Sequence, residues 1–262
     1  MFEVAPLELP IGHLFAVHRH LVTVRDAVLE GRLGRAFVDR RETPTAARLD
    51  LGCYALFGGD PGAARDLVAS VAAPIELIQP DLAQADGAWR RYFLDQYGHR
   101  LQDRPMEAFS GASLEPNALR RLADRLPAAY RLAPLDAHTA AGLDGSLEPH
   151  GLQTFPAPEA LARDGMAWGV FPIGERETSV PVSVASSYAI SSQHVEVAIS
   201  TRVEHRGRGL AAAVAARFCL DALERGLEPC WHAANPVSIR LARRLGFEPA
   251  GTCAVLYLSA DG

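Results

Sequence analysis

Two glycines in a short arginine-rich segment stand between a predicted strand and a predicted helix. The segment reads Arg206-Gly207-Arg208-Gly209 and runs directly into leucine and alanines. Glycine lets a ligand approach the backbone closely, and the first turn of a helix presents free N–H groups and a favourable dipole to an anion. This pattern predicts a phosphate cradle built from backbone N–H groups, to which the arginines add charge-assisted hydrogen bonds.

The elements on either side of this turn follow from the spacing of their apolar residues. Val195, Val197 and Ile199 alternate with more polar residues, which is the period of a half-buried strand. Leu210 and Val214 stand four residues apart in an alanine-rich stretch, which is the period of a helix. The strand, the turn and the helix together place the cradle at a helix N-terminus.

A second motif begins about twenty residues after that helix starts, and it reads C-W-H-A-A-N-P-V-S-I-R-L-A-R-R-L-G-F. Together the two segments resemble the cofactor motifs of the GNAT superfamily of acyl-CoA N-acyltransferases. The wording of the second motif is similar to that of zwittermicin-type antibiotic self-resistance acetyltransferases within this superfamily. The resemblance rests on Arg206, Gly209 and Ala211 for the R-x-x-G-x-A loop, and on Asn235, Ser238, Leu241 and Leu245-Gly246-Phe247 for the second motif.

The resemblance implies acetyl-CoA as the cofactor and transfer of its acetyl group to a primary amine of a small molecule or peptide. The pyrophosphate would lie on the backbone N–H groups of the glycine turn, and the pantetheine arm would pair like an extra strand with the strand before it. Asn235 is expected to cap the last helix, with Pro236 at its first position. The residues expected to bind the cofactor are Ile199, Thr201, Arg206, Gly207, Arg208, Gly209, Leu210, Ala211, Asn235 and Ser238.

Direct attack of an amine on a thioester needs a base that takes a proton from the amine. Glu196 points to the face opposite Val195, where many members of the superfamily have a carboxylate that activates the amine through water. His194 shares that face and is the other candidate. Polar residues at alternate strand positions also describe an ordinary solvated face, so the sequence leaves both interpretations open.

The departing thiolate is where the sequence differs from the superfamily pattern. A tyrosine in the last helix often protonates the thiolate, but Ala242 stands at this position here. Tyr188, Ser238 or Tyr257 would replace it. Alternatively the thiolate leaves unaided, because a thiol with a pKa of about 8.5 is a fair leaving group near neutral pH.

Composition indicates an ordinary α/β enzyme. A chain of 262 residues with 48% hydrophobic content has room for one large domain or two modest ones, and a net charge of −5 gives no attraction to nucleic acid or an anionic membrane. All 26 basic residues are arginine, which excludes a lysine Schiff base. Because no basic segment precedes an apolar run, no signal peptide is expected, and we expect a cytoplasmic protein. We also expect a monomer or a homodimer. The longest apolar run, 210–216, is too short to span a membrane.

Two residue types invite a metal interpretation that the spacing does not favour. The four cysteines share no metal-like spacing and read as buried free thiols. His13, His18 and His20 lie close in sequence, but no acidic or cysteine partner stands near them. No metal site is expected.

The N-terminal half repeats, in outline, the order of elements expected after residue 194. The expected order is a strand over 48–57, a glycine turn, a helix over 62–71, a strand over 74–78, a helix over 82–96 and a strand over 100–109. Residues 1–128 are therefore predicted to form a smaller α/β lobe, with the hypothesis that it is a degenerate GNAT-like half. Asp60 would cap the helix after its turn and repel an anion, so no cofactor is expected there. Residues 129–262 would form the GNAT acetyltransferase domain, an α/β fold with a mixed sheet.

Two other functions compete with acetyl transfer. A catalytically silent GNAT-like module would bind acyl-CoA as a sensor or an interaction platform, and Ala242 is the residue that favours it. A dinucleotide-binding oxidoreductase would place its glycine motif early and an acidic ribose-binding residue after the next strand. The glycine motif here comes late and lacks that residue, so the oxidoreductase is excluded.

Overall fold

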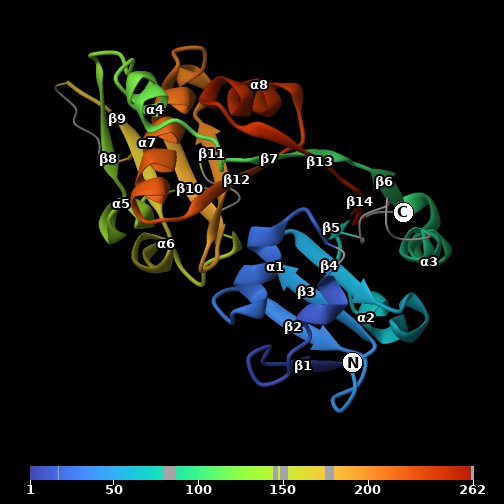
Figure 1. Cartoon of the computed structure of the whole chain (residues 1–262). Coiled ribbons are helices and arrows are strands. Elements are labelled where there is room, and N and C mark those ends of the chain that lie inside the picture. The colour runs from blue at the N-terminus through green and yellow to red at the C-terminus, as the bar shows by residue number, and fades with distance from the viewer. Residues whose placement is uncertain (17, 79–86, 144–146, 148–152, 175–179, 261–262) are drawn as a thin grey trace. The chain divides into compact units, whose positions relative to one another are not determined.

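The computed structural model of the chain describes residues 1–16, 18–78, 87–143, 147, 153–174 and 180–260 (Figure 1). The chain forms two compact units, of which one comprises Met1–Ala108 with Ala250–Gly262 and the other Phe109–Pro249. The described strands form two sheets of seven strands each. The predicted mixed α/β fold is confirmed.

The first unit is built on a sheet that includes a strand from the far end of the sequence. Its pairs are antiparallel, except that β4 and β5 run parallel. An aromatic cluster fills its core, where the ring of Phe57 lies 5.0 Å from that of Phe93 and 5.2 Å from that of Trp89. The strand order is β1 (Phe2–Val4), β2 (Arg35–Val38), β3 (Ala46–Leu51), β4 (Tyr54–Gly59), β5 (Ile75–Ile78), β14 (Val255–Leu258) and β6 (Leu101–Asp103), with helices α1 (Val22–Leu29), α2 (Arg65–Ala69) and α3 (Ala88–Tyr97).

Two strands predicted as single elements are each divided in two. The expected strand over 48–57 is the hairpin of β3 and β4, which turns at Gly52 with a φ of +57° that glycine adopts without strain. The expected strand over 100–109 is β6 followed by β7 (Met106–Ser110). The expected helix over 82–96 is described from Ala88 onward as α3, and its first residues lie outside the described ones.

Most of the other sheet lies in the second unit, together with the long helix α7 (Leu210–Glu224); strands β7 and β13 (Glu248–Cys253) of this sheet begin or end in the first unit. In this sheet β11 pairs antiparallel with β10 and parallel with β12. Figure 1 shows α7 lying across the strands of the sheet, with α4 beside it. The strand order is β13 (Glu248–Cys253), β7, β12 (Glu228–Ala233), β11 (His194–Thr201), β10 (Ser183–Ile190), β9 (Ala167–Pro172) and β8 (Tyr130–Pro134), with helices α4 (Pro116–Ala123), α5 (Ala137–Ala141), α6 (Pro158–Asp164), α7 (Leu210–Glu224) and α8 (Pro236–Leu245).

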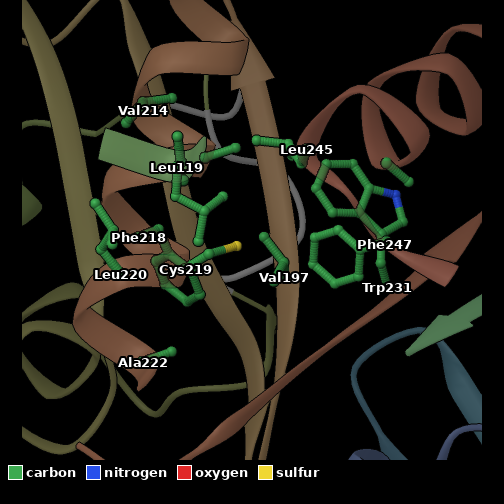
Figure 2. Packing of buried hydrophobic residues seen from close by; sticks show 14 of the residues in the cluster. Leu119, Val197, Val214, Phe218, Cys219, Leu220, Ala222, Trp231, Leu245 and Phe247 are labelled. Carbon is green, nitrogen blue, oxygen red and sulfur yellow. The ribbon is translucent and has the colours of Figure 1, made fainter. Parts of the chain in front are cut away.

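The core of the second unit lies between α7 and one face of this sheet. The alanines of α7 other than Ala211 are buried and small, so the helix lies close to the strands. Figure 2 shows Phe218 of α7, Leu119 of α4 and Val197 of β11, which belong to one buried cluster with Trp231 and Phe247. Because Val195 and Val197 face this cluster, Glu196 points to the other face of the sheet.

The sequence predicted a division near residue 128, whereas the compact units divide after Ala108. Helix α4 packs against α7, and this contact keeps residues 109–128 with the second unit. Strand β14 returns to the first sheet between β5 and β6, which is why the end of the chain belongs to the first unit. The first unit is an α/β structure whose parallel pair, β4 and β5, has the orientation of β11 and β12.

Candidate active site

Strands β11 and β12 run side by side only over their first residues. Their parallel register pairs residues 194–196 with residues 228–230, and within the described strands it ends there. Strand β11 continues to Thr201 and stays paired with β10 on its other side. Beyond Glu196 the edge of β11 that faced β12 is therefore open.

The backbone groups that face this open edge follow from the hydrogen bonds at the two ends of β11. On the β12 side, the carbonyl of Gln193 accepts from the N–H of Glu228 at 2.8 Å; on the β10 side, the N–H of Arg202 donates to the carbonyl of Val182 at 2.9 Å. Since successive residues of a strand direct their backbone groups to alternate sides, Ile199 directs its N–H and C=O to the open edge. An extended ligand could pair with them as a strand would.

The turn between β11 and α7 has the geometry of an anion cradle. Gly207 and Gly209 have φ values of +75° and +81°, and open space lies where a Cβ would stand on either one. Gly209 is the N-cap of α7, whose first turn has neither a side-chain cap nor an acidic residue. The N–H groups of Leu210 and Ala211 therefore lie in the uncapped first turn, where an anion is favoured.

A tyrosine that the sequence did not single out holds this turn in place. The hydroxyl of Tyr130 on β8 accepts from Nη1 of Arg208 at 2.8 Å and pairs with Nδ1 of His205 at 3.0 Å. Arg208 also donates from Nη2 to the carbonyl of Glu204 at 3.1 Å, and Nε of Arg206 donates to the carbonyl of Thr201 at 3.0 Å. Both arginines expected at the phosphate thus also bind the protein.

Glu196 lies where the two strands separate, and it is only 5% exposed. Its Oε1 accepts the backbone N–H of His232 at 3.0 Å and pairs with the imidazole Nδ1 of the same residue at 2.9 Å. Its Oε2 is buried and has no hydrogen-bond partner in the described part of the chain. The sequence did not single out His232, because the pairing becomes visible only once the register places Cys230 opposite Glu196.

Other buried polar groups gather on the same face of the sheet. His194 precedes Glu196 by two residues, and Ser186 stands opposite Ala198, so both side chains share the face of Glu196. Nδ1 of His194 and Oγ of Ser186 are buried without a hydrogen-bond partner among the described residues. Buried polar atoms are rarely left unsatisfied, so three of them on one face mark a place where a ligand or water would bind.

Tyr188 stands at an irregularity in β10, next to the residue paired with Glu196. The register passes from Ser187 opposite Val197 to Ala189 opposite Glu196, so Tyr188 is the extra residue of a β-bulge. Bulges redirect side chains and are common beside active sites. Tyr188 is 4% exposed, and its backbone stands at the level of Glu196 in the register.

Two residues of the second motif, Asn235 and Ser238, make hydrogen bonds within the protein. Oδ1 of Asn235 accepts the N–H groups of Val237 and Ser238 at 3.1 and 3.0 Å, with Pro236 at the first helical position. The predicted cap is confirmed. Oγ of Ser238 accepts from Nε1 of Trp231 at 2.9 Å, so this hydroxyl already supports the core.

Ala242 and Tyr257, the two other positions considered for the acid, lie on elements other than β10 and β11. Ala242 is fully buried in the core of the second unit. Tyr257 lies on β14 in the first unit, with the guanidinium of Arg104 at 3.6 Å from its ring. Neither residue belongs to the face of β11 that carries Glu196.

The structure bears on one of the cysteines and on the histidines that invited a metal interpretation. The thiol of Cys219 is fully buried, and this burial raises its pKa far above the usual range, so it stays protonated. No described group of three His, Cys, Asp or Glu side chains could hold a metal ion, and Nε2 of His18 pairs with the carbonyl of Phe57 at 2.6 Å. No described helix is both long and apolar enough to cross a bilayer.

Comparison with known proteins identifies the family. The family model described as GNAT acetyltransferase matches residues 13–256. The chain belongs to the GNAT acetyltransferase family. It is thus an acyltransferase, and the resemblance seen in the sequence is confirmed for the superfamily. The similarity to the zwittermicin-resistance branch stays a prediction.

Relatives of this GNAT acetyltransferase agree with that assignment. The uncharacterized N-acetyltransferase YdfB of Bacillus subtilis is 37% identical over 78 residues, which are 29% of this chain and 30% of that protein. A GCN5-related N-acetyltransferase-like protein from Streptococcus suis is 26% identical with a TM-score of 0.80, covering 95% of this chain and 96% of that one. A tandem GNAT protein from the clavulanic acid biosynthesis pathway, 14% identical, has a TM-score of 0.54 over 99% and 98% of the two chains and shows the fold alone.

Proposed function

We propose that the second unit binds acetyl-CoA and transfers the acetyl group to a primary amine of a small molecule or peptide. The observation that carries this proposal is the open edge of β11, which leads into the uncapped N-terminus of α7 at Gly209. A thioester arm and a pyrophosphate need these two features in this order. The buried carboxylate of Glu196 lies at the other end of the open edge.

The cofactor is proposed to lie along this edge. The backbone N–H groups of residues 207–211 take the pyrophosphate, and Arg206 and Arg208 add charge beside it. The pantetheine arm pairs with Ile199 and Thr201. On the side of α8, Asn235 offers the amino group of its side chain, which takes no part in the cap, and Ser238 lies in the first turn of that helix.

Bound acetyl-CoA supplies an electrophilic thioester carbonyl and a thiolate leaving group. Glu196, or His194 in its place, accepts a proton from the amine, directly or through one water. Tyr188 protonates the departing thiolate, or the thiolate leaves unaided. Glu196 and His194 are proposed to act here because they share one face where β11 and β12 separate, and Tyr188 because it stands at the bulge of β10 beside Glu196.

Two measurements test this proposal. Calorimetry with acetyl-CoA is expected to show binding, and a thiol reagent is expected to show release of free CoA that depends on an added primary amine, with spermidine, lysine and an N-terminal peptide as probes. Glu196→Gln is expected to lower kcat about 10²- to 10⁴-fold, the usual contribution of a general base, with an unchanged Kd for acetyl-CoA. Glu224→Gln, an exposed residue on α7, is the matched control.

Two results would overturn it. If calorimetry shows no binding of acetyl-CoA, the proposed cofactor site is refuted. Tight binding without amine-dependent thiol release for any probe would favour the silent acyl-CoA-binding module instead.

The first unit is proposed to bind no acetyl-CoA, although β4 and β5 are parallel as β11 and β12 are. At the carboxyl end of β4, Nε2 of His18 pairs with the carbonyl of Phe57 at 2.6 Å, and Nε1 of Trp89 donates to that of Gly59 at 3.1 Å. Asp60 caps the following turn through the N–H of Gly62 at 2.8 Å, which places a negative charge where a phosphate would lie. Native mass spectrometry is expected to find one acetyl-CoA per chain; two would contradict the proposal.

A further inference from the structure

Past the end of the β11–β12 pairing, a side chain accepts a backbone N–H of β12. Glu196 and Cys230 are the last paired residues, so the N–H of His232 has no place in the ladder. Oε1 of Glu196 accepts it at 3.0 Å. The carboxylate thus takes the place of a strand at the point where the strands separate.

The imidazole of His232 approaches the same oxygen. Its Nδ1 lies 2.9 Å from Oε1 of Glu196, and the two side chains are 5% and 6% exposed. As the proposed base, Glu196 would enter the reaction ionised and could only accept hydrogen bonds, so Nδ1 of His232 would carry the hydrogen. Two donors from a single residue therefore converge on Oε1 and fix both the position and the plane of the carboxylate.

A purely structural role for Glu196 accounts for only half of this arrangement. Satisfying the N–H of His232 explains Oε1, but not why Oε2 is buried without a partner in the described part of the chain. An unsatisfied buried oxygen of a charged group is costly, and the neutral amide of glutamine would accept the same N–H. The uncommitted Oε2 is explained if it receives a proton from a bound molecule.

We propose that His232 is the positioning residue of the active site, which commits Oε1 of Glu196 and leaves Oε2 as the oxygen that takes the proton of the amine. This rests on the proposed role of Glu196 as the base. Oε2 takes one proton from the substrate ammonium, and the nitrogen lone pair then forms the C–N bond. The C–S bond breaks and its electron pair leaves with sulfur. The nitrogen loses its second proton, and the thiolate gains one from Tyr188, which the nitrogen's proton replaces, or else leaves unprotonated while that proton passes to solvent; Glu196 returns its own proton to solvent.

Four variants test the positioning role: His232→Ala, His232→Asn, Glu196→Gln, and Glu196→Gln combined with His232→Ala. They are assayed on the full chain with acetyl-CoA and whichever probe amine, spermidine, lysine or the peptide, is turned over fastest. His232→Ala is expected to lower kcat about 10- to 100-fold, as expected for loss of a hydrogen bond to a charged group, with KM for acetyl-CoA unchanged. Asparagine keeps an N–H donor near Nδ1 and is expected to restore most of kcat.

The double variant separates positioning from general damage. If His232 acts through Glu196, the double variant is expected to be no slower than Glu196→Gln alone, because residues that act as a unit are not additive. His99→Ala, which removes an exposed histidine of the first unit, is the control and is expected to leave kcat unchanged.

Nitrogen NMR of ¹⁵N-histidine-labelled protein tests the contact without turnover. The His232 signal, assigned from its loss in His232→Asn, is expected to show a protonated Nδ1 that shifts in Glu196→Gln. Additive losses in the double variant, an asparagine variant as slow as the alanine variant, or an Nδ1 without hydrogen would each overturn the positioning role. A Glu196→Gln variant with normal kcat would instead refute Glu196 as the base, which is a separate failure.

Discussion

The substitution Tyr130→Phe removes one hydroxyl group on a strand that is remote in sequence from the glycine turn, and it is expected to weaken acetyl-CoA binding. Tyr130 lies on β8, is 8% exposed, and reaches the glycine turn through Arg208 and His205. Phenylalanine keeps the ring and its contacts in the core. The substitution therefore removes only the two hydrogen bonds that hold the turn in the shape of the cradle.

The size of the effect follows from those two bonds. The bond from Arg208 is charge-assisted at 2.8 Å and the one to His205 is ordinary at 3.0 Å. In isolation they would amount to about 2–4 kcal/mol, but both partners reach the surface of the turn, and water replaces part of the loss. We expect about 1–2 kcal/mol, which corresponds to a rise of roughly 5- to 30-fold in Kd if preorganisation of the turn is lost.

Calorimetry with acetyl-CoA and thermal unfolding measure the two consequences separately. Tyr97→Phe is the matched control, because its hydroxyl donates to the carbonyl of Val68 in the first unit. Both variants are expected to lower Tm by a few degrees, and only Tyr130→Phe is expected to raise the Kd. A Kd within twofold of the wild-type value in Tyr130→Phe would refute the role of Tyr130 in shaping the cradle.

Two further substitutions test other features. Gly209→Val is expected to raise the Kd for acetyl-CoA at least about 100-fold, because the valine methyl groups would occupy the open cradle. Gly226→Val is the control, because Gly226 has a φ of +74° and equally open space around it. The control variant has the same backbone strain of about 1–2 kcal/mol and is expected to leave the Kd unchanged. Burial opposes ionisation of Asp39, but hydrogen bonds led by that from the Ala46 N–H lower its pKa to about 2, below its unfolded value of about 3.9. The ionised carboxylate of Asp39 therefore stabilises the folded state fully above about pH 4, and this stabilisation is lost as the pH falls toward 2. In urea unfolding, Asp39→Asn is expected to lower the free energy of unfolding by about 1 kcal/mol at pH 7 after solvent screening, and by less at pH 3. The same difference between variant and wild type at both pH values would contradict this.

Features that depend on neighbouring residues could be read from the sequence. The cap formed by Asn235 and Pro236 and the turn around Gly207 and Gly209 are local, and the structure has the predicted cap and a positive φ at both glycines. The alternation along β11 placed Glu196 on the face away from the core, and the structure agrees. The family followed from the resemblance of the two local motifs to those of the GNAT superfamily, and the mixed α/β fold from that resemblance.

Features that depend on strand register could not be read in this way. Tyr130 and Arg208 are 78 residues apart in sequence, and His232 and Glu196 are 36 apart. Nothing in the local pattern of either strand states which residue stands opposite which. The break at Gly52 was missed for a related reason, because apolar residues on both sides of it read as one continuous strand.

The position of β14 has a consequence for biosynthesis. This strand lies between β5 and β6, so the first sheet is still incomplete in a nascent chain that has emerged only as far as residue 249. Until β14 emerges from the ribosome, the edges of β5 and β6 that it covers have no strand beside them, and open edges can pair with other chains. These two edges are covered only once Val255–Leu258 has emerged and paired with both strands.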